Sequence, residues 1–216
     1  MTTATLATST LESILEPIEL VEPIDRHPLL LDVSNAVLQV TPDQFDQLCQ
    51  DNPDLRLELG KNGELIVMAP AGGETGGKNI DLATDVNLWN RQTNLGKAFD
   101  SSTGYDFTAI GGGKLSPDVS WIEKSRLEGV SLKGLIPIVP DFVIELRSRT
   151  DRLKTLQEKM QEYRRLGVRL GLLINPQSET VELYRPEQEV EVLQSPEAID
   201  CGEVMPGFIL SLSRIW

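Results

Sequence analysis

Two carboxylates have the clearest capacity for chemistry in this sequence. Asp118 follows Pro117 at the start of the segment PDVSWI, and Glu145 lies 27 residues later inside the apolar segment FVIELR. Side chains alternate along a strand, so Val143, Glu145 and Arg147 are predicted to share one face. A glutamate in an otherwise apolar strand costs free energy unless it is paired or binds a metal. If the strand of Asp118 lies beside it, the two carboxylates converge at a sheet edge and can hold Mg²⁺.

The scarcity of histidine and cysteine narrows the available chemistry. The sequence has one histidine, His27, and two cysteines, Cys49 and Cys201, which form no CxxC pair. Ser-His-Asp and Cys-His catalysis need a placed imidazole, and structural zinc sites need closely spaced cysteines or histidines. Carboxylates, lysines and an oxygen-preferring metal ion remain. The distant cysteines favour two small buried residues in a reducing cytoplasm over a disulfide scaffold.

Each acidic candidate also has a purely structural interpretation. Glu145 could form a buried ion pair with Arg147 or Arg149, because structural ion pairs also place charges in cores. Asp118 taken alone is a typical turn residue after a proline. Asp141 also follows a proline, but it lies four residues before Glu145 on one strand. That separation is roughly 13 Å at the rise of a strand, too far for the two to share an ion directly.

The order of the predicted elements indicates the fold class. Residues 1–35 are rich in Glu, Thr, Leu and Pro without clear periodicity, which predicts a flexible N-terminal tail. Residues 36–216 are predicted to form one domain in which strands alternate with helices, and this order favours an α/β fold with a mixed β-sheet flanked by helices. The segment MTTATLATST lacks the features of a secretory signal, and no apolar run is long enough to cross a bilayer, so no membrane partner is expected.

Several segments in combination resemble a known group of proteins. The pattern SPD…PDFVIELRS resembles the PD-(D/E)XK nuclease superfamily, and more narrowly the Uma-two family of restriction-endonuclease-like proteins. Supporting segments are NGELIVMAPAGGETG, SPDVSWI, LKTLQEKMQEYRRLGV, LGLLINP and PGFILSL. The resemblance implies a restriction-endonuclease-like core with extra N- and C-terminal strands. It also implies a metal-dependent endonuclease that hydrolyses DNA phosphodiester bonds, with Mg²⁺ as cofactor and Mn²⁺ as an alternative.

The same resemblance implies roles for individual acidic and basic residues. Asp118 and Glu145 match the metal-binding acids, and Glu74 matches an acidic residue on the first core helix. The third position of the motif, normally lysine, is Arg147 in this sequence. Arginine stays protonated and cannot act as a general base, although it can clamp a phosphate or stabilise developing charge. Arg147 therefore weakens the expectation of cleavage, but it does not weaken the expectation of the fold.

In the resembling family a lysine comes from the following helix, and Lys159 is its match. Lys159 shares a helical stripe with Leu156 and Tyr163, so it is predicted to face the sheet near the carboxylates. Taken alone, Lys159 is more typical of a solvated helix lysine. Glu74 taken alone is more typical of an acid favoured by the dipole at a helix N-terminus.

The segment GGETGGKN, residues 72–79, nearly matches the phosphate-binding loop G-x-x-x-x-G-K-[ST]. It departs at the last position, where Asn79 replaces the hydroxyl that binds Mg²⁺, and Glu74 would place a negative charge inside the phosphate cradle. Nucleotide hydrolysis is therefore not expected.

Net charge motivates a rival function. The sequence has 20 basic and 33 acidic residues, a balance of −13, which should repel bulk nucleic acid. The segments LRSRTDRLK and YRRLGVR are locally basic, so a basic rim around Glu145 is predicted on an otherwise negative surface. The alternative is a catalytically weak or inactive nuclease-fold module that binds nucleic acid or protein. A homodimer is also considered, because enzymes that cut both strands of a duplex are often dimers.

Overall fold

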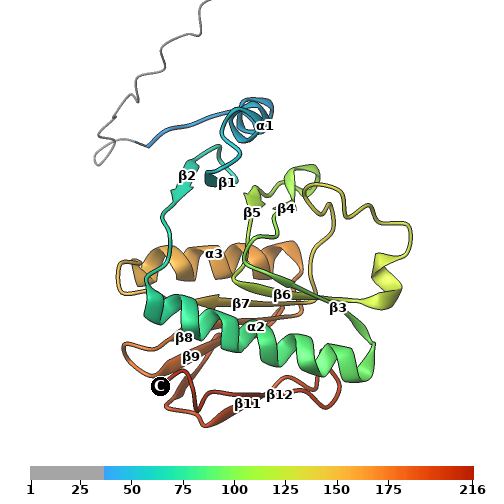
Figure 1. Cartoon of the computed structure of the whole chain (residues 1–216), viewed down its shortest axis with the longest axis vertical. Helices are drawn as coiled ribbons and strands as arrows, with labels where there is room; N and C mark the ends of the chain where they lie inside the picture. The colour runs from blue at the N-terminus through green and yellow to red at the C-terminus, as the bar shows by residue number, and fades with distance from the viewer. Residues whose placement is uncertain (1–36) are drawn as a thin grey trace, which may run out of the picture. The chain divides into compact units, whose positions relative to one another are not determined.

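The structure, a computed structural model, describes residues 37–216 (Figure 1). The predicted tail, residues 1–35, and His27 lie outside the described residues. The helices of the described part are α1 (Pro42–Asp51), α2 (Gly73–Thr93) and α3 (Leu153–Leu166), with two short 3₁₀ helices, η1 (Thr108–Ile110) and η2 (Lys124–Leu127).

The larger sheet has six strands in the order β10-β9-β8-β7-β6-β3. Its strands are β3 (Gly96–Asp100), β6 (Val119–Glu123), β7 (Phe142–Leu146), β8 (Leu170–Asn175), β9 (Thr180–Tyr184) and β10 (Glu191–Gln194). β7 and β8 are parallel and are connected through α3, whereas every other neighbouring pair in this sheet is antiparallel. The predicted mixed sheet with helices is confirmed.

A smaller sheet has four strands in the order β2-β1-β5-β4, and a third pair, β11 with β12, is antiparallel. The strands are β1 (Arg56–Leu59), β2 (Leu65–Met68), β4 (Tyr105–Asp106), β5 (Lys114–Leu115), β11 (Ala198–Asp200) and β12 (Ile209–Ser211). In Figure 1, α1 and the β1–β2 hairpin lie above the larger sheet, and α2 crosses in front of it. β1 and β2 are the additional N-terminal strands that the sequence predicts, and β11 and β12 are the additional C-terminal strands.

The core is divided between the two faces of the larger sheet. Alternate residues of β7 belong to different clusters: Ile144 packs with α2 and the β11–β12 segment, whereas Val143 packs with α3. Met160 and Tyr163 on α3 are fully buried against that second face. Alternation along β7 therefore directs Glu145 toward α3.

Local sequence explains where several elements begin and end. Thr41 caps α1 in a capping box with Gln44, and Gly167 ends α3 in the left-handed conformation at φ 103°. α3 has no side-chain cap, because the Asp151 carboxylate, which lies just before it, accepts the N–H of Ser148 and closes the preceding turn.

β4 is short and ends at Asp106. The Asp106 carboxylate accepts both the N–H and the hydroxyl of Thr108 and bends the chain into η1.

No helix in the described part of the chain combines the length and the apolarity needed to cross a membrane.

Candidate active site

Asp118 and Glu145 come together through the pairing of β6 with β7. The antiparallel register aligns Val119 with Ile144, so one further step sets Asp118 opposite Glu145. Residues opposite each other in such a pair have Cα atoms about 4.5–5.5 Å apart. The Asp118 carboxylate bends back to the neighbouring strand, where its Oδ2 accepts the N–H of Leu146 at 2.8 Å. The structure therefore brings the two predicted acids to one place, at the end of β7.

Lys159 lies beside Glu145, on the face of α3 that its helical spacing predicts. Its Nζ is 2.9 Å from Glu145 Oε1, 2.9 Å from Glu58 Oε1 and 3.0 Å from the carbonyl oxygen of Ser116. The Lys159 side chain is 12% exposed, and those of Glu58 and Glu145 are 4% and 5% exposed. Glu145 also accepts a hydrogen bond from the Tyr163 hydroxyl at 3.2 Å. Its ion-pair partner is thus Lys159, and neither Arg147 nor Arg149 takes that place in the described structure.

Glu58 is a member of this cluster that sequence reasoning missed. It lies on β1 of the smaller sheet, and its Oε1 also accepts the N–H of Ser116 at 2.8 Å. The alternation of apolar and charged residues from Leu55 to Leu59 is typical of a half-exposed strand, whose charged face would meet solvent. In the fold it is turned inward toward Lys159, which only the placement of the second sheet determines.

Burial and charge act against each other in this cluster. Burial raises the pKa of Glu145 above its ordinary value, Lys159 opposes that rise, and the Asp118 and Glu58 carboxylates add to it. Burial alone would lower the pKa of Lys159, but Glu145 and Glu58 outweigh it and leave that pKa raised. Lys159 is therefore a permanent cation, and Glu145 is an acid whose ionised form needs more positive charge than Lys159 supplies.

The residues present suit a hard divalent cation. Among residues 37–216 no three acidic, histidine or cysteine side chains are grouped closely enough to form a complete metal cage. Mg²⁺ does not require one, because it commonly keeps several waters and binds through one or two carboxylates together with substrate phosphates. The Asn79 amide adds a further polar group: its Nδ2 donates to Asp118 Oδ1 at 3.0 Å, and its buried Oδ1 has no hydrogen-bond partner within the described residues. Such an unpaired buried oxygen costs about 1–3 kcal/mol in the absence of a ligand.

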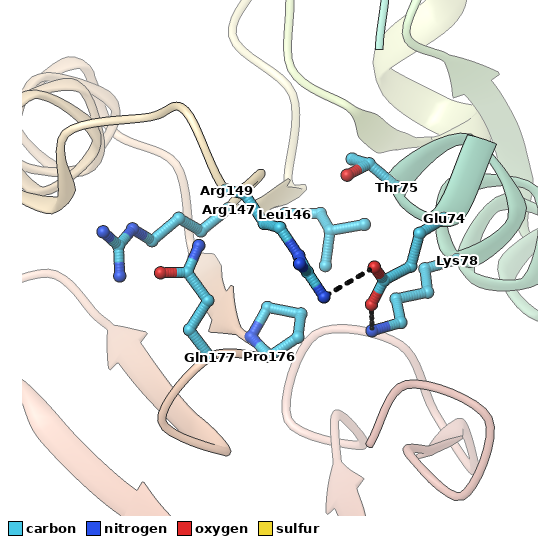
Figure 2. A pocket seen from close by; sticks show the side chains of 8 residues that line it. All are labelled: Glu74, Thr75, Lys78, Leu146, Arg147, Arg149, Pro176 and Gln177. Carbon is cyan, nitrogen blue, oxygen red and sulfur yellow. Dashed lines mark hydrogen bonds and ion pairs between the residues drawn. The ribbon is translucent and has the colours of Figure 1, made fainter. Parts of the chain in front are cut away.

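Glu74 does not join the two acids. It lies in the first turn of α2 and pairs with Lys78 at 3.0 Å and with Arg149 at 3.3 Å. Figure 2 shows Glu74 held between these two cations at one side of a small pocket, whose wall also includes Leu146. The hydrogen bond from Lys78 lowers the pKa of Glu74, and the charges of Lys78 and Arg149 lower it further.

Arg147 forms no bond with either of the two carboxylates. β7 ends at Leu146, but the N–H of Arg147 still donates to the carbonyl oxygen of Ile174 in β8 at 2.9 Å. Its guanidinium donates to the carbonyl oxygen of Asp151 at 3.2 Å and to Asn175 Oδ1 at 3.3 Å. In Figure 2 the Arg147 side chain points away from Glu74. Asn175 lies two residues beyond Leu173, which packs on the α3 side, so the guanidinium stays on the side of the sheet that Glu145 faces, and the role of Arg147 stays a prediction.

The predicted basic rim is present only in part. Lys78, Arg147 and Arg149 line the pocket beside the acids. The second basic segment, YRRLGVR, lies elsewhere: Arg169 pairs with Asp141 at the opposite end of β7, and Arg165 pairs with Glu162. Its charges are far from Glu145 because β8 runs parallel to β7, which places Arg169 beside the beginning of β7 rather than its end.

The mixed sheet, its flanking helices and the buried acids at the end of β7 define a restriction-endonuclease-like α/β protein. A crystal structure described as a putative nuclease belonging to DUF820, from Anabaena variabilis ATCC 29413, has this fold with a TM-score of 0.69. The two chains are 24% identical, over 82% of this chain and 97% of the other.

A family model places the chain more narrowly. Residues 42–213 match Uma2, described as "Putative restriction endonuclease", and the chain belongs to this family. A comparison with curated proteins found no match. The family membership and the fold that the sequence predicts are thus confirmed, whereas the metal, the substrate and the roles of individual residues stay predictions.

Proposed function

We propose that this protein is a Mg²⁺-dependent endodeoxyribonuclease whose metal ion is held by Asp118 and Glu145. One observation carries the proposal. Lys159 pairs with Glu58 and Glu145, and the Asp118 carboxylate lies close enough to Glu145 to raise its pKa. The site therefore holds more carboxylates than cations in largely buried surroundings, and a divalent ion would supply the missing positive charge.

Each residue of the cluster has a role suited to hydrolysis of a phosphodiester. Asp118 and Glu145 would hold the ion, which polarises the phosphodiester and lowers the pKa of a bound water. Lys159 stays protonated, so its role is to stabilise the negative charge that develops on the phosphoryl group rather than to act as a base. Glu58 also pairs with Lys159 and keeps its ammonium group in place.

The cations beside the acids suit an anionic polymer. Lys78 and Arg149 lie next to Leu146, whose N–H binds Asp118, so a phosphate bound to them would lie close to the acidic pair. Both are now paired with Glu74, and a DNA phosphate would compete with that carboxylate. The net charge of the chain is −13, which should repel DNA from the rest of the surface and favour contact at the pocket lined by Lys78 and Arg149.

The decisive experiment measures cleavage of supercoiled, linear and single-stranded DNA by the full chain with Mg²⁺, Mn²⁺ or EDTA. We expect cleavage with either metal, none with EDTA, and none from Asp118→Asn or Glu145→Gln at matched folding. Asp81 on α2 is half-buried, pairs with Arg214 and is not part of the cluster, and Asp81→Asn is the matched control that should cleave like the wild type. Unchanged cleavage by Asp118→Asn would refute the assigned site.

The alternative, a nuclease-fold module that binds without cutting, is favoured by the closed pairing of Lys159 with two carboxylates. It predicts metal binding and DNA binding with no cleavage of any DNA form. The same assay, run beside a DNA-binding measurement, separates the two functions. Sedimentation of the wild type on a duplex tests the homodimer expected of an enzyme that cuts both strands.

A further inference from the structure

Asn79 is the residue of α2 that contacts the acidic pair. It is the last residue of GGETGGKN, and its side chain is directed toward β6 rather than toward solvent. Glu74 lies five positions earlier, which on an α-helix turns it to a different side. The two polar residues of this segment therefore serve different places, although they are close in sequence.

The Asp118 carboxylate is held on both of its oxygens. Oδ1 accepts from Asn79 Nδ2 at 3.0 Å, and Oδ2 accepts from the N–H of Leu146 at 2.8 Å. One donor comes from a helix and the other from a neighbouring strand, so together they fix the rotation of the carboxylate group. Each oxygen still has a lone pair free for a cation, because a carboxylate accepts at about four positions in total.

We propose that Asn79 is the positioning residue of the metal site, and that Glu74 is not part of that site. The proposal rests on the proposed function, since it concerns the same cation. Partners that orient a metal-binding carboxylate raise affinity by restricting it to the binding geometry. The Asn79 amide does this through Nδ2, and its buried Oδ1, which has no partner within residues 37–216, remains available to a polar ligand.

The surroundings of Glu74 support the second half of the proposal. Its side chain is 58% exposed and already engages two cations, Lys78 and Arg149. An acid satisfied by two cations at the surface contributes little to the affinity of a separate cation. Glu74 instead controls how freely Lys78 and Arg149 can meet an anion.

The test is Mn²⁺ affinity, measured by calorimetry and by electron paramagnetic resonance on the full chain without DNA. We expect Asn79→Ala and Asn79→Leu to weaken Mn²⁺ binding by about 10- to 100-fold. Leucine keeps the volume of the side chain without its amide, so it tests the hydrogen bond in a well-packed protein. Glu74→Ala and the exposed α2 variant Asn87→Ala should bind Mn²⁺ like the wild type.

A second readout separates positioning from a general structural effect. In DNA cleavage, the Asn79→Leu variant should recover most of the wild-type rate when Mn²⁺ is raised in proportion to its weaker binding, because only the occupancy of the site has changed. Wild-type Mn²⁺ affinity in Asn79→Leu, or a loss in Glu74→Ala as large as in Asn79→Leu, would overturn the inference.

Failure of the proposed function itself gives a different result. In that case the wild type and Asp118→Ala bind Mn²⁺ equally weakly, whatever residue stands at position 79. Metal binding that needs Asp118 but ignores Asn79 would retain the proposed function and reject only the positioning role.

Discussion

The two ends of β7 carry acids in similar sequence contexts and use them in opposite ways. Pro117-Asp118 and Pro140-Asp141 are both Pro-Asp pairs that precede a strand. Because β6 and β7 are antiparallel, their first residues lie at opposite ends, and Asp118 meets Glu145 while Asp141 stays at the far end. The same Pro-Asp dipeptide is therefore found in two different electrostatic environments.

At the Asp141 end the charges are balanced. Asp141 is completely buried, pairs with Arg126 at 2.7 Å and Arg169 at 3.4 Å, and accepts the N–H of Glu123 at 2.9 Å. Glu123 is itself paired with Arg169 at 3.4 Å. Two carboxylates thus pair with two guanidinium groups, so the charges at this end are balanced without another cation.

At the Glu145 end, Lys159 pairs with Glu58 and Glu145, and the nearby Asp118 carboxylate raises the pKa of Glu145, so carboxylates outnumber cations. The difference teaches that burial of an acid does not by itself indicate function. A buried acid with enough cations around it contributes to the fold, whereas a surplus of acids indicates a ligand that the protein chain does not supply. Four predictions test this contrast, ordered from the largest expected effect to the smallest.

The largest effect is expected from Lys159→Met. Methionine fills a similar volume but leaves Glu58 and Glu145 buried face to face without their cation, at a cost of about 3–5 kcal/mol in the free energy of unfolding. Urea denaturation measures it. Lys154→Met on the same helix is the control, since Lys154 is 87% exposed, and a change within about 0.5 kcal/mol is expected there. Equal effects at both positions would mean that the cluster is not held by Lys159.

The next prediction compares the two Pro-Asp acids directly. Asp141→Asn should lower the free energy of unfolding by about 3 kcal/mol, because two cations lose their partner. Asp118→Asn should lower the stability of the metal-free protein by only about 1 kcal/mol, since it loses one of the two hydrogen bonds that Asp118 accepts but removes a surplus negative charge. Added Mg²⁺ should raise the melting temperature of Asp141→Asn but not that of Asp118→Asn. A loss of stability in Asp118→Asn as large as in Asp141→Asn would remove the distinction between the two ends.

Local patterns account for the parts of the site that were predicted from sequence. Strand alternation set Glu145 apart from its apolar neighbours, and helical spacing turned Lys159 toward the sheet. Both arguments need only the geometry of one element, and most strands and helices were likewise located from their own periodicity. Family resemblance then linked Asp118 to Glu145, which no local pattern could do.

The residues that were missed or misplaced depend on how elements meet. Glu58 has an ordinary alternating pattern, and its inward face exists only because the smaller sheet packs near α3. Asn79 differs from an exposed helix residue only through its contact with β6. The partners of Arg147 come from the segment before α3 and from β8, which the pattern of β7 alone does not predict. Orientation relative to a neighbouring element is a tertiary property that sequence periodicity does not contain.

A smaller effect is expected from removing one arginine at each end. Arg149→Ala should weaken DNA binding and lower the slope of log affinity against log salt by about 1, as for the loss of one phosphate contact. Arg169→Ala should leave that slope unchanged and lower stability, because Arg169 serves Asp141. Fluorescence anisotropy across a salt series measures both slopes. If only Arg169→Ala lowered the slope, the DNA would bind at the Asp141 end of β7, away from the proposed metal site.

The smallest effect is expected from Gly77→Ala near the Glu145 end, and Gly96→Ala near the Asp141 end gives a larger, opposite effect for comparison. A Cβ on Gly96, which pairs with Glu123 at the Asp141 end, would lie 2.2 Å from the carbonyl oxygen of Ile122, so Gly96→Ala should destabilise the fold. A Cβ on Gly77, two residues before Asn79 inside α2, would meet nothing within 4 Å. Gly77→Ala should therefore stabilise the protein by about 0.5–1 kcal/mol through helix propensity alone.

That gain raises the question of why α2 retains a glycine where alanine is better for the helix. If DNA approaches this face closely, Gly77→Ala should raise stability in urea denaturation and lower DNA affinity at the same time, with Mn²⁺ affinity unchanged. If Gly77→Ala raised stability and left DNA affinity unchanged, this face of α2 would not contact DNA. The substrate would then have to reach the acidic end of β7 from the side of Arg149. At the Asp141 end, the chain itself fills the space beside Gly96. At the Glu145 end, the space beside Gly77 is open, so the two ends differ in shape as well as in charge.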